Sequence, residues 1–215
     1  MRVEVKVCGL TRPADARAAA DLGARYIGVI FAGGPRTVNP ERAREVLDGG
    51  GSNVTRVGVF GETDTATIAA TVREARLDVV QLHADPLSDT VRAVGDATGA
   101  RVWAVLRVDG PLAARALEKL WTSADALVLD SKVKGVLGGS GISFDWAAAE
   151  EATHARMGRL VVAGGLTAAN VGEAIERLSP DVVDVSSGVE SSPGIKDHAR
   201  IADFIEAVRR TGVLR

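Results

Sequence analysis

The chain has 215 residues, of which 46% are hydrophobic, so it can bury one sizeable core but is too short for two catalytic domains. Its formal net charge is −2, with acidic and basic residues mixed along the chain, which argues against a nucleic-acid-binding or membrane-seeking protein. We therefore expect one domain over residues 1–215 whose partner is a small molecule. The sequence assigns no protein partner.

Short apolar runs recur along the chain, and each is followed by an Ala-rich amphipathic stretch. The runs predict about eight strands and the amphipathic stretches predict helices. Several helices open with a proline, where the missing N–H costs nothing. The predicted strands are 3–7, 26–31, 54–60, 79–82, 102–106, 126–129, 160–163 and 182–185, and the helices start near Pro13, Pro40, Thr65, Pro86, Leu112, Phe144, Thr167 and Lys196.

The predicted strands are apolar throughout, which is typical of a parallel sheet covered on both faces. Strict alternation of strand and helix permits either an open, doubly wound sheet or a closed (β/α)8 barrel. The number of strands favours the barrel, and the length is close to its lower limit of about 200 residues. We therefore predict an α/β fold, a single-domain TIM barrel of parallel strands.

The sequence also excludes several kinds of site and location. No apolar run approaches the roughly 18 residues of a transmembrane helix, and the N-terminus lacks the apolar core of a secretory signal. We therefore expect a cytoplasmic protein. Cys8 is the one cysteine, so neither an intramolecular disulfide nor a cysteine-based metal site can form within the chain.

Polar residues gather where the predicted strands end. Barrels of this kind build their active sites from the carboxyl ends of the strands and the loops that follow. We therefore expect the substrate site at this end of the barrel. Its candidate residues are Cys8, Arg36, Gln81, His83, Arg107, Asp130, Gly164, Gly165, Ser186, Ser187 and Gly188.

Two of these loops favour a phosphate site. The stretch 164–167 leads into a predicted helix, so its glycine N–H groups can approach an anion and add to the field of the helix N-terminus. The stretch 186–188 offers hydroxyl groups and a second close backbone. Either loop alone would fit a simple strand-to-helix turn equally well. The two together, after the last two strands of a barrel, favour phosphate.

Cys8 is a candidate base, although a lone cysteine at a strand end is more often a small buried hydrophobe. A thiolate in the barrel mouth can abstract a proton if a nearby positive charge lowers the thiol pKa from its free value of about 8.5. Lys6 is near in sequence, but strand alternation turns its side chain the other way from Val7. We therefore do not assign Lys6 as that partner.

Asp130 is a candidate acid because it follows the apolar run 126–129. Burial at the end of such a strand would raise the pKa of the carboxyl above its usual value of about 3.9, so that it holds a proton to donate. The alternative is an aspartate that caps a helix or a turn. A Gly-rich loop over 132–141 follows it rather than a helix, which makes capping the weaker interpretation.

The remaining candidates each have two interpretations. Arg36 either pairs with a substrate carboxylate through its fork of donors or is an exposed arginine in a mobile loop. His83 either contacts the substrate or only orients the backbone, and we expect His154 and His198 to face solvent. The glycines over 135–141 match no dinucleotide fingerprint and indicate a mobile lid with glycine hinges.

Several short stretches form a pattern that runs in order through the whole chain. They are Lys6–Thr11, Gly34–Arg36, Val57–Phe60, Val80–His83, Leu129–Ser131, Gly138–Gly141, Phe144–Trp146, Ala163–Leu166, Asp184–Glu190 and Pro193–Asp197. Any one of them is weak evidence, but the first and the last two together are specific. The pattern resembles the phosphoribosylanthranilate isomerase family of tryptophan biosynthesis.

The resemblance implies an Amadori rearrangement of N-(5-phosphoribosyl)anthranilate to 1-(2-carboxyphenylamino)-1-deoxyribulose 5-phosphate, without metal or organic cofactor. It implies that Asp130 is the general acid that opens the furanose ring to a Schiff base. Cys8 is then the general base that takes the C2 proton. Arg36 would hold the anthranilate carboxylate, and the loops at 164–165 and 186–188 would hold the phosphate.

Two positions depart from the family pattern, because Gly34 stands where serine is usual and Ala84 where glycine is usual. The first departure would loosen the loop that carries Arg36. The nearest alternative is the histidine-pathway isomerase that acts on an aminoimidazole carboxamide ribotide. A resemblance to that family would imply two aspartates in the roles of acid and base. Cys8 therefore argues against it, although activity on both substrates stays open.

A second alternative is a barrel that binds a phosphate ligand without catalysis. Such a protein would have no need of both Cys8 and Asp130, and the presence of the two residues therefore favours an enzyme.

Overall fold

A computed structural model of the chain describes residues 3–108, 114–131, 153 and 156–212. The Gly-rich loop over 132–141 with the lid expected at 135–141, the helix expected near Phe144, and His154 lie outside the described residues. Within the described part, no helix is long and apolar enough to span a bilayer.

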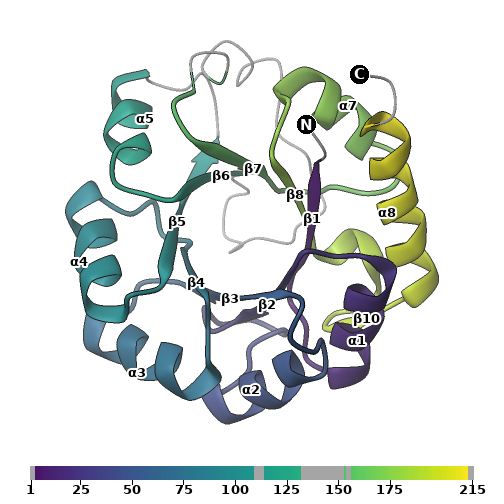
Figure 1. Cartoon of the computed structure of the whole chain (residues 1–215), viewed down its shortest axis with the longest axis horizontal. Helices are drawn as coiled ribbons and strands as arrows, with labels where there is room; N and C mark the ends of the chain where they lie inside the picture. Colours follow the sequence, from purple (N-terminus) through teal and green to yellow (C-terminus); the bar gives the residue numbers. More distant parts are fainter. Residues whose placement is uncertain (1–2, 109–113, 132–152, 154–155, 213–215) are drawn as a thin grey trace.

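The strands form a closed parallel barrel, as predicted. Each strand pairs with its successor in the chain, and the last strand closes the ring against the first. Figure 1 shows the strands as a central ring with the helices around its outside. The strands are β1 Glu4–Val7, β2 Tyr26–Ile30, β3 Thr55–Phe60, β4 Val79–Leu82, β5 Arg101–Val108, β6 Ala126–Ser131, β7 Arg159–Val162 and β8 Val182–Val185.

The helices begin close to where the sequence predicts. Pro13, Pro40 and Thr65 each begin a helix as expected, and Asn39 and Asp64 cap the second and third of these through their side chains. The helices are α1 Pro13–Leu22, α2 Pro40–Asp48, α3 Thr65–Ala75, α4 Ser88–Thr98, α5 Ala114–Trp121, α7 Val171–Leu178 and α8 His198–Gly212, and a short 3-10 helix, η1, spans Ser187–Val189.

Two helix starts differ from the prediction. The backbone after Thr167 first forms a turn, because the Asn170 side chain accepts a hydrogen bond from Thr167 N and donates one to Gly165 O, so α7 begins only at Val171. Lys196 lies in a two-stranded antiparallel sheet of β9 Glu190–Ser192 and β10 Ile195–Lys196, which the sequence analysis missed. The side chain of Asp197 accepts hydrogen bonds from Ala199 N and Arg200 N, so α8 begins after it.

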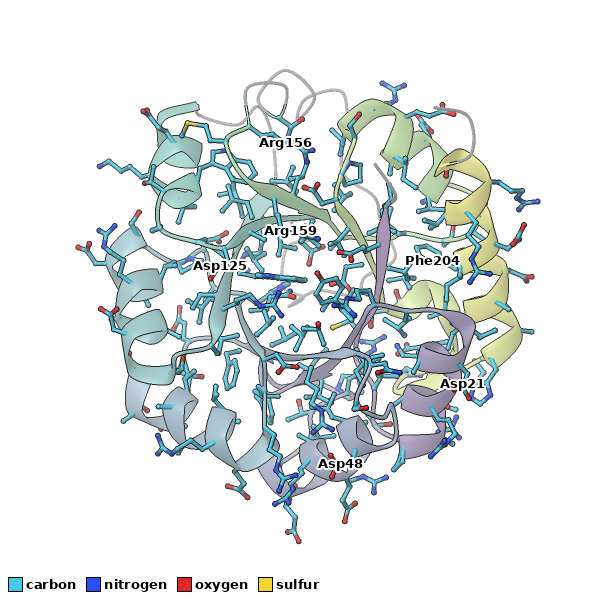
Figure 2. All side chains as sticks on the ribbon, in the orientation of Figure 1. Asp21, Asp48, Asp125, Arg156, Arg159 and Phe204 are labelled. Atoms are coloured by element: carbon cyan, nitrogen blue, oxygen red, sulfur yellow. The ribbon has the colours of Figure 1, made fainter. Side chains whose placement is uncertain are left out.

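The barrel has two separate apolar layers because side chains alternate along each strand. One layer lies between strands and helices and includes Ile27, Leu129 and Phe204, the last of which projects from α8 toward the strands in Figure 2. The other fills the barrel interior and contains Val79 and Trp103, among other buried residues. The parity of a strand residue therefore determines whether it faces the helices or the interior.

The amino ends of the strands are closed by polar contacts. Glu4 accepts a hydrogen bond from Tyr26 Oη at 3.1 Å and one from Arg159 Nη2 at 2.5 Å. The ring of Tyr26 packs edge-on against Trp103 at 5.0 Å. This end of the interior is filled, so space for a substrate is expected at the carboxyl ends.

Candidate active site

The predicted acid and base lie at the carboxyl ends of their strands. Cys8 directly follows β1, and its backbone N–H donates to Val185 O at 2.8 Å. Asp130 is the penultimate residue of β6 and is paired in register with Arg107 of β5. In the barrel order, only β7 and β8 stand between β6 and β1. Acid, base and the two glycine- and serine-rich loops therefore belong to four neighbouring strands.

Strand parity turns these side chains inward. Val128 belongs to the interior layer and Leu129 to the outer one, so Asp130 points into the barrel mouth. Val5 and Val7 belong to the outer layer, so Lys6 points into the interior. Asp130 lies near the end of β6 and is only 5% exposed.

Lys6 lies beside Cys8, and the sequence analysis was wrong to leave it out. Two residues apart on a strand, they share a face, because alternation restores direction at every second position. A Cβ placed on Gly28 of β2 would lie 3.1 Å from Cys8 Sγ and 3.4 Å from Lys6 Nζ. Lys6 Nζ also donates to Asp184 Oδ2 of β8 at 2.6 Å.

The charge state of Cys8 reflects a balance between burial and its neighbours. Burial raises the pKa of the thiol, and the cations of Lys6 and Lys196, which favour the thiolate, offset this only in part. Burial also opposes a charged Lys6, but the Asp184 carboxylate and the Cys8 sulfur outweigh it and raise the pKa of the ammonium. The resting site therefore has a cation beside a thiol.

His83 lies next to the proposed acid. Its imidazole is buried, and Nε2 is 3.4 Å from Asp130 Oδ2. Burial lowers the pKa of His83 to about 4, with contributions from the positive charges of Lys6 and Arg107. The imidazole is therefore neutral at physiological pH. Its ring nitrogens form no hydrogen bond of good geometry within the described part of the chain.

Arg36 is held in place by a carboxylate of the chain itself. Its Nε and Nη2 donate to the two oxygens of Glu190 at 2.8 and 2.7 Å, and its side chain is 14% exposed. Lys196 Nζ donates to the same carboxylate at 2.8 Å. The alternative of an exposed arginine is therefore wrong. These two bonds use two of the five N–H donors of the guanidinium.

Arg107 and Gln81 also lie at this end of the barrel. Arg107 pairs with Asp85, with 2.6 Å between Nη2 and Oδ2, and its side chain is 27% exposed. Gln81 is 2% exposed and follows Val79 of the interior layer by two positions, so its amide faces inward. The structure therefore brings both residues to the predicted mouth.

The two predicted phosphate loops are in direct contact. Gly164 and Gly165 have φ of 87° and 66°, values that favour glycine. A Cβ on Gly188 would lie 2.0 Å from Leu166 O, so this close approach of the two backbones requires glycine. The prediction that the first loop leads directly into a helix is wrong, because the Asn170 turn intervenes.

Several buried polar atoms near the mouth lack partners. Among the described residues they form no hydrogen bonds, and they come from β4, β8 and the loops that follow. A substrate rich in hydroxyl groups would satisfy such atoms. They are Gln81 Oε1, His83 Nδ1 and Nε2, Asp184 Oδ1 and Ser186 Oγ. Within the part described, no three His, Cys, Asp or Glu side chains gather into a metal-binding group.

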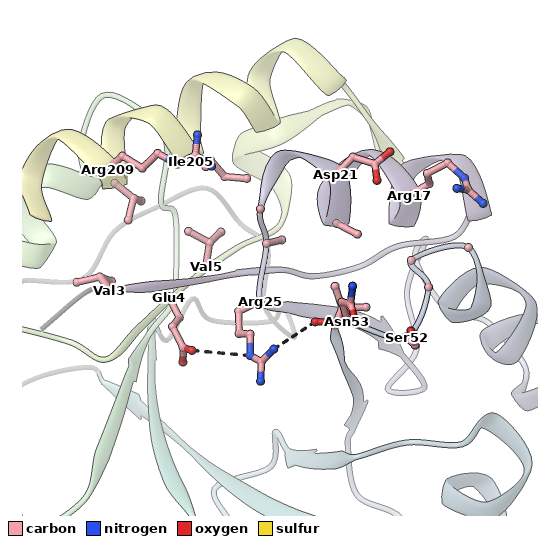
Figure 3. Close-up of a pocket in the computed structure, with 18 residues that line it drawn as sticks. Val3, Glu4, Val5, Arg17, Asp21, Arg25, Ser52, Asn53, Ile205 and Arg209 are labelled. Carbon is pink, nitrogen blue, oxygen red and sulfur yellow. Dashed lines mark hydrogen bonds and ion pairs between the residues drawn. The ribbon is translucent and has the colours of Figure 1, made fainter.

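One cavity lies at the other end of the barrel. It encloses about 1180 Å³ beside α1, α8 and the turn over 49–54. Figure 3 shows Glu4 and Arg25 at its wall, with Arg25 also bonded to Asn53. Since catalytic residues of such barrels lie at the carboxyl ends, we do not assign this cavity to the active site.

Four site residues escaped the sequence analysis. Lys6 and Asp184 carry a parity signal, because each lies on a strand two positions before a predicted site residue that directly follows that strand. Glu190 and Lys196 lie in the motifs that carry the family resemblance, but no local pattern pairs them with Arg36. The last histidine, His198, is half exposed as expected, but its Nε2 also lies 2.9 Å from Asp15 Oδ1.

Comparison with known proteins gives a consistent result. A family model described as N-(5'-phosphoribosyl)anthranilate (PRA) isomerase matches residues 5–207. A protein of Acidithiobacillus ferrooxidans named N-(5'-phosphoribosyl)anthranilate isomerase is 43% identical over 97% of this chain and 98% of its own. A protein of Paramagnetospirillum magneticum with the same name is 41% identical, over 97% and 98%.

Solved structures agree with the sequence relatives. The phosphoribosyl anthranilate isomerase of Thermus thermophilus superposes with a TM-score of 0.86 at 33% identity, over 97% of this chain and 99% of its own. A phosphoribosyl anthranilate isomerase in complex with reduced 1-(o-carboxyphenylamino)-1-deoxyribulose 5-phosphate superposes with a TM-score of 0.82 at 31% identity, over the same shares.

Proposed function

The chain belongs to the N-(5'-phosphoribosyl)anthranilate isomerase family, and we propose that Cys8 is its general base and Asp130 its general acid. It acts as an isomerase of tryptophan biosynthesis. The reaction is the Amadori rearrangement of N-(5'-phosphoribosyl)anthranilate to 1-(2-carboxyphenylamino)-1-deoxyribulose 5-phosphate. The family assignment argues against the two alternatives, which were a phosphate-binding barrel without catalysis and a member of the histidine-pathway isomerase family.

One observation carries the assignment of acid and base. Cys8 directly follows β1 and Asp130 is the penultimate residue of β6, both at the carboxyl ends of their strands, and β7 and β8 lie between these strands in the barrel. A sugar phosphate anchored by those loops would present opposite sides of its ribose to the two groups. Ring opening needs a donor and C2 deprotonation needs a base, so two separate groups are required.

The chemistry proceeds in steps that balance. Asp130 gives a proton to the furanose ring oxygen, and the C1–O bond breaks as the nitrogen lone pair forms the C1=N Schiff base. The Cys8 thiolate takes the C2 proton, and the electron pair of that bond forms C1=C2 while the C1=N pair returns to nitrogen. The resulting enaminol becomes the ketose when C1 gains a proton and the C2 hydroxyl loses one.

The ends of the substrate carry charges that match the mouth. Arg36 would hold the anthranilate carboxylate with donors left free by Glu190. The backbone of Gly164, Gly165 and Gly188, with the hydroxyls of Ser186 and Ser187, would hold the phosphate. Gln81, His83 and Arg107 would line the space between the carboxylate and phosphate sites. Buried polar atoms there, which form no hydrogen bond among the described residues, would bind the hydroxyl groups of the substrate.

Two substitutions test the roles of acid and base. We expect Cys8→Ser and Asp130→Asn each to lower kcat by about 100-fold to 10,000-fold, the contribution of general acid–base catalysis. Both changes conserve size, so binding of the reduced product analogue, measured by calorimetry, should stay close to native. A variant with near-native kcat would show that its residue has another role.

Asp125→Asn is the matched control. Asp125 precedes β6 at the opposite end of the strand and accepts a hydrogen bond from Val102 N at 2.7 Å, which an amide oxygen also accepts. The same chemical change is therefore made on the same strand far from the mouth, and kcat should not change.

A further inference from the structure

The interior of the barrel holds a buried ion pair below Cys8. Lys6 is completely buried, Asp184 is 7% exposed, and 2.6 Å separate Nζ from Oδ2. The apolar layer of the interior consists of valine, alanine, tyrosine and tryptophan side chains. Replacing a buried ion pair with apolar packing is often neutral or stabilising, so fold stability does not by itself account for these charges.

The geometry places the ammonium beside the thiol. Lys6 and Cys8 project from the same face of β1, and Gly28 of β2 leaves the space beside them unfilled. Both Nζ and Sγ lie within 3.4 Å of the point that a side chain at Gly28 would occupy. The carboxylate of Asp184 holds Lys6 Nζ from the β8 side.

Lys6 is the strongest cation acting on the thiol. Its attraction for the thiolate exceeds both the repulsion from Asp184 and the attraction from Lys196. Among the described residues, the cation of Arg36 also interacts with Cys8, and its charge is balanced by the bidentate pair with Glu190. Removal of Lys6 would therefore leave the thiolate without its main counter-charge.

The same cation acts on the acid side of the mouth. The Lys6 charge contributes to the low pKa of His83, which keeps the imidazole beside Asp130 neutral. A neutral imidazole places no full positive charge against the proposed acid. The positive charge of Lys6 therefore lies beside Cys8, the proposed base, while the imidazole beside Asp130, the proposed acid, stays neutral.

We propose that Lys6 is a positioning residue for the isomerase reaction, whose ammonium, held by Asp184, stabilises the Cys8 thiolate that takes the C2 proton. The inference rests on the proposed role of Cys8 as base. Lys6 itself gives up no proton in this scheme. The thiol loses its proton to solvent before the thiolate attacks the C2–H bond, and the ammonium lowers the free energy of that thiolate.

The test combines a neutral and a charge-conserving variant. Lys6→Met removes the cation, and Lys6→Arg keeps it. Because Lys6→Met leaves Asp184 buried without a partner, the double variant Lys6→Met/Asp184→Asn is the fallback if the single variant does not fold. The thiolate midpoint of Cys8 should move up in the double variant as in Lys6→Met, because Lys6 acts on the thiol more strongly than Asp184 does.

The first readout titrates the thiolate directly. The chain has one cysteine, so the ultraviolet thiolate absorbance of each variant, less that of its Cys8→Ser counterpart, reports Cys8 alone. An opposite charge in contact shifts a pKa by about 1–3 units. We expect the thiolate midpoint to move up by about that much in Lys6→Met and to return toward native in Lys6→Arg.

The second readout is the pH profile of turnover. The acid limb of kcat/KM should move to higher pH by the same amount, a loss of about tenfold per unit at fixed pH, while binding of the reduced product analogue stays constant. If Lys6 had only a structural role, Lys6→Met would lower the stability of the fold and leave the acid limb of kcat/KM at its native pH.

Arg159→Met provides the control. Arg159 pairs with Glu4 at the amino end of the barrel, about 13 Å along β1 from Cys8, and the thiolate midpoint should not move. An unchanged midpoint in Lys6→Met overturns the inference, as does a midpoint that moves without the acid limb. Failure of the proposed function is separate, because it would appear as near-native turnover of Cys8→Ser with Lys6 intact.

Discussion

A single methyl group at Gly188 should separate the two loops assigned to the phosphate. Gly188 does not have the positive φ that favours glycine, so Gly188→Ala introduces no backbone strain of its own. The added Cβ would lie 2.0 Å from Leu166 O, 3.1 Å from Leu166 C and 3.3 Å from Thr167 Cγ2. Two of these three atoms are backbone, which cannot rotate away.

The size of the effect follows from that distance. A Cβ essentially never comes within 3.0 Å of another heavy atom, so the loop after β7 and the loop after β8 must move apart by about 1 Å. Overpacking of this kind costs about 1–3 kcal/mol of folding free energy. A misplacement of about 1 Å in a binding site lowers catalytic efficiency by about 100-fold.

Steady-state kinetics would check this prediction. We expect Gly188→Ala to lose about 100-fold in kcat/KM, mainly through KM for the phosphoribosyl substrate, and to bind inorganic phosphate more weakly in calorimetry. Urea denaturation would separately measure the loss of stability. The control is Gly95→Ala in α4, where the nearest atom would be Val102 Cγ2 at 3.7 Å, an ordinary contact. Alanine there should stabilise the helix by about 0.5–1 kcal/mol.

The reasoning would be refuted by a Gly188→Ala enzyme that folds and keeps native KM and phosphate affinity. In that case the phosphate would not lie between the two loops, and the contact of Gly188 with Leu166 would serve only packing.

Two further predictions concern Arg36 and His83. Arg36→Lys keeps the charge but loses the planar fork of donors, so KM for the substrate should rise about 10-fold to 100-fold at nearly constant kcat. The control is Arg42→Lys, at the more exposed pair with Glu45, which should change neither KM nor kcat. An unchanged KM in Arg36→Lys would exclude Arg36 as the carboxylate ligand. For His83, folding lowers the pKa from 6.5 to about 4, so below pH 6.5 the unfolded chain takes up a proton that the folded chain does not, and stability is lost as pH falls through this window. We expect His83 to lower the free energy of unfolding of the native protein by about 2 kcal/mol between pH 7 and pH 5. In urea titrations, His83→Gln should lack this pH-dependent loss of stability. An identical pH dependence in both proteins would show that His83 is not buried as a neutral ring.

Much of the fold was predictable because its signals are local. All eight runs identified in the sequence are strands in the barrel, and β4 and β8 have the predicted bounds. The turn that delays α7 was not predicted, because it depends on the Asn170 side chain reaching back to Gly165 O. The β9–β10 pair was missed because its strands are short and carry no apolar alternation.

The candidate site was predictable in part for the same reason. A residue that ends an apolar strand can be recognised from its immediate neighbours, which is how Cys8, Asp130 and His83 were found. Lys6 was within reach, because the alternation that places Val5 and Val7 outside places residues 6 and 8 together inside.

The sequence by itself determined which groups the chain brings to a barrel mouth, and its motifs determined the family and therefore the substrate. Only the tertiary structure decided which of these groups touch. The Lys6–Asp184 pair joins residues 178 positions apart, and the Arg36–Glu190 pair joins residues 154 apart. The first pair exists because the ring closes with β8 against β1, and the second because the segment after β8 reaches the loop after β2. Contacts of this range depend on closure, and the charge of a buried group depends on its contacts, so the environment of Cys8 could not be predicted from its neighbours in sequence.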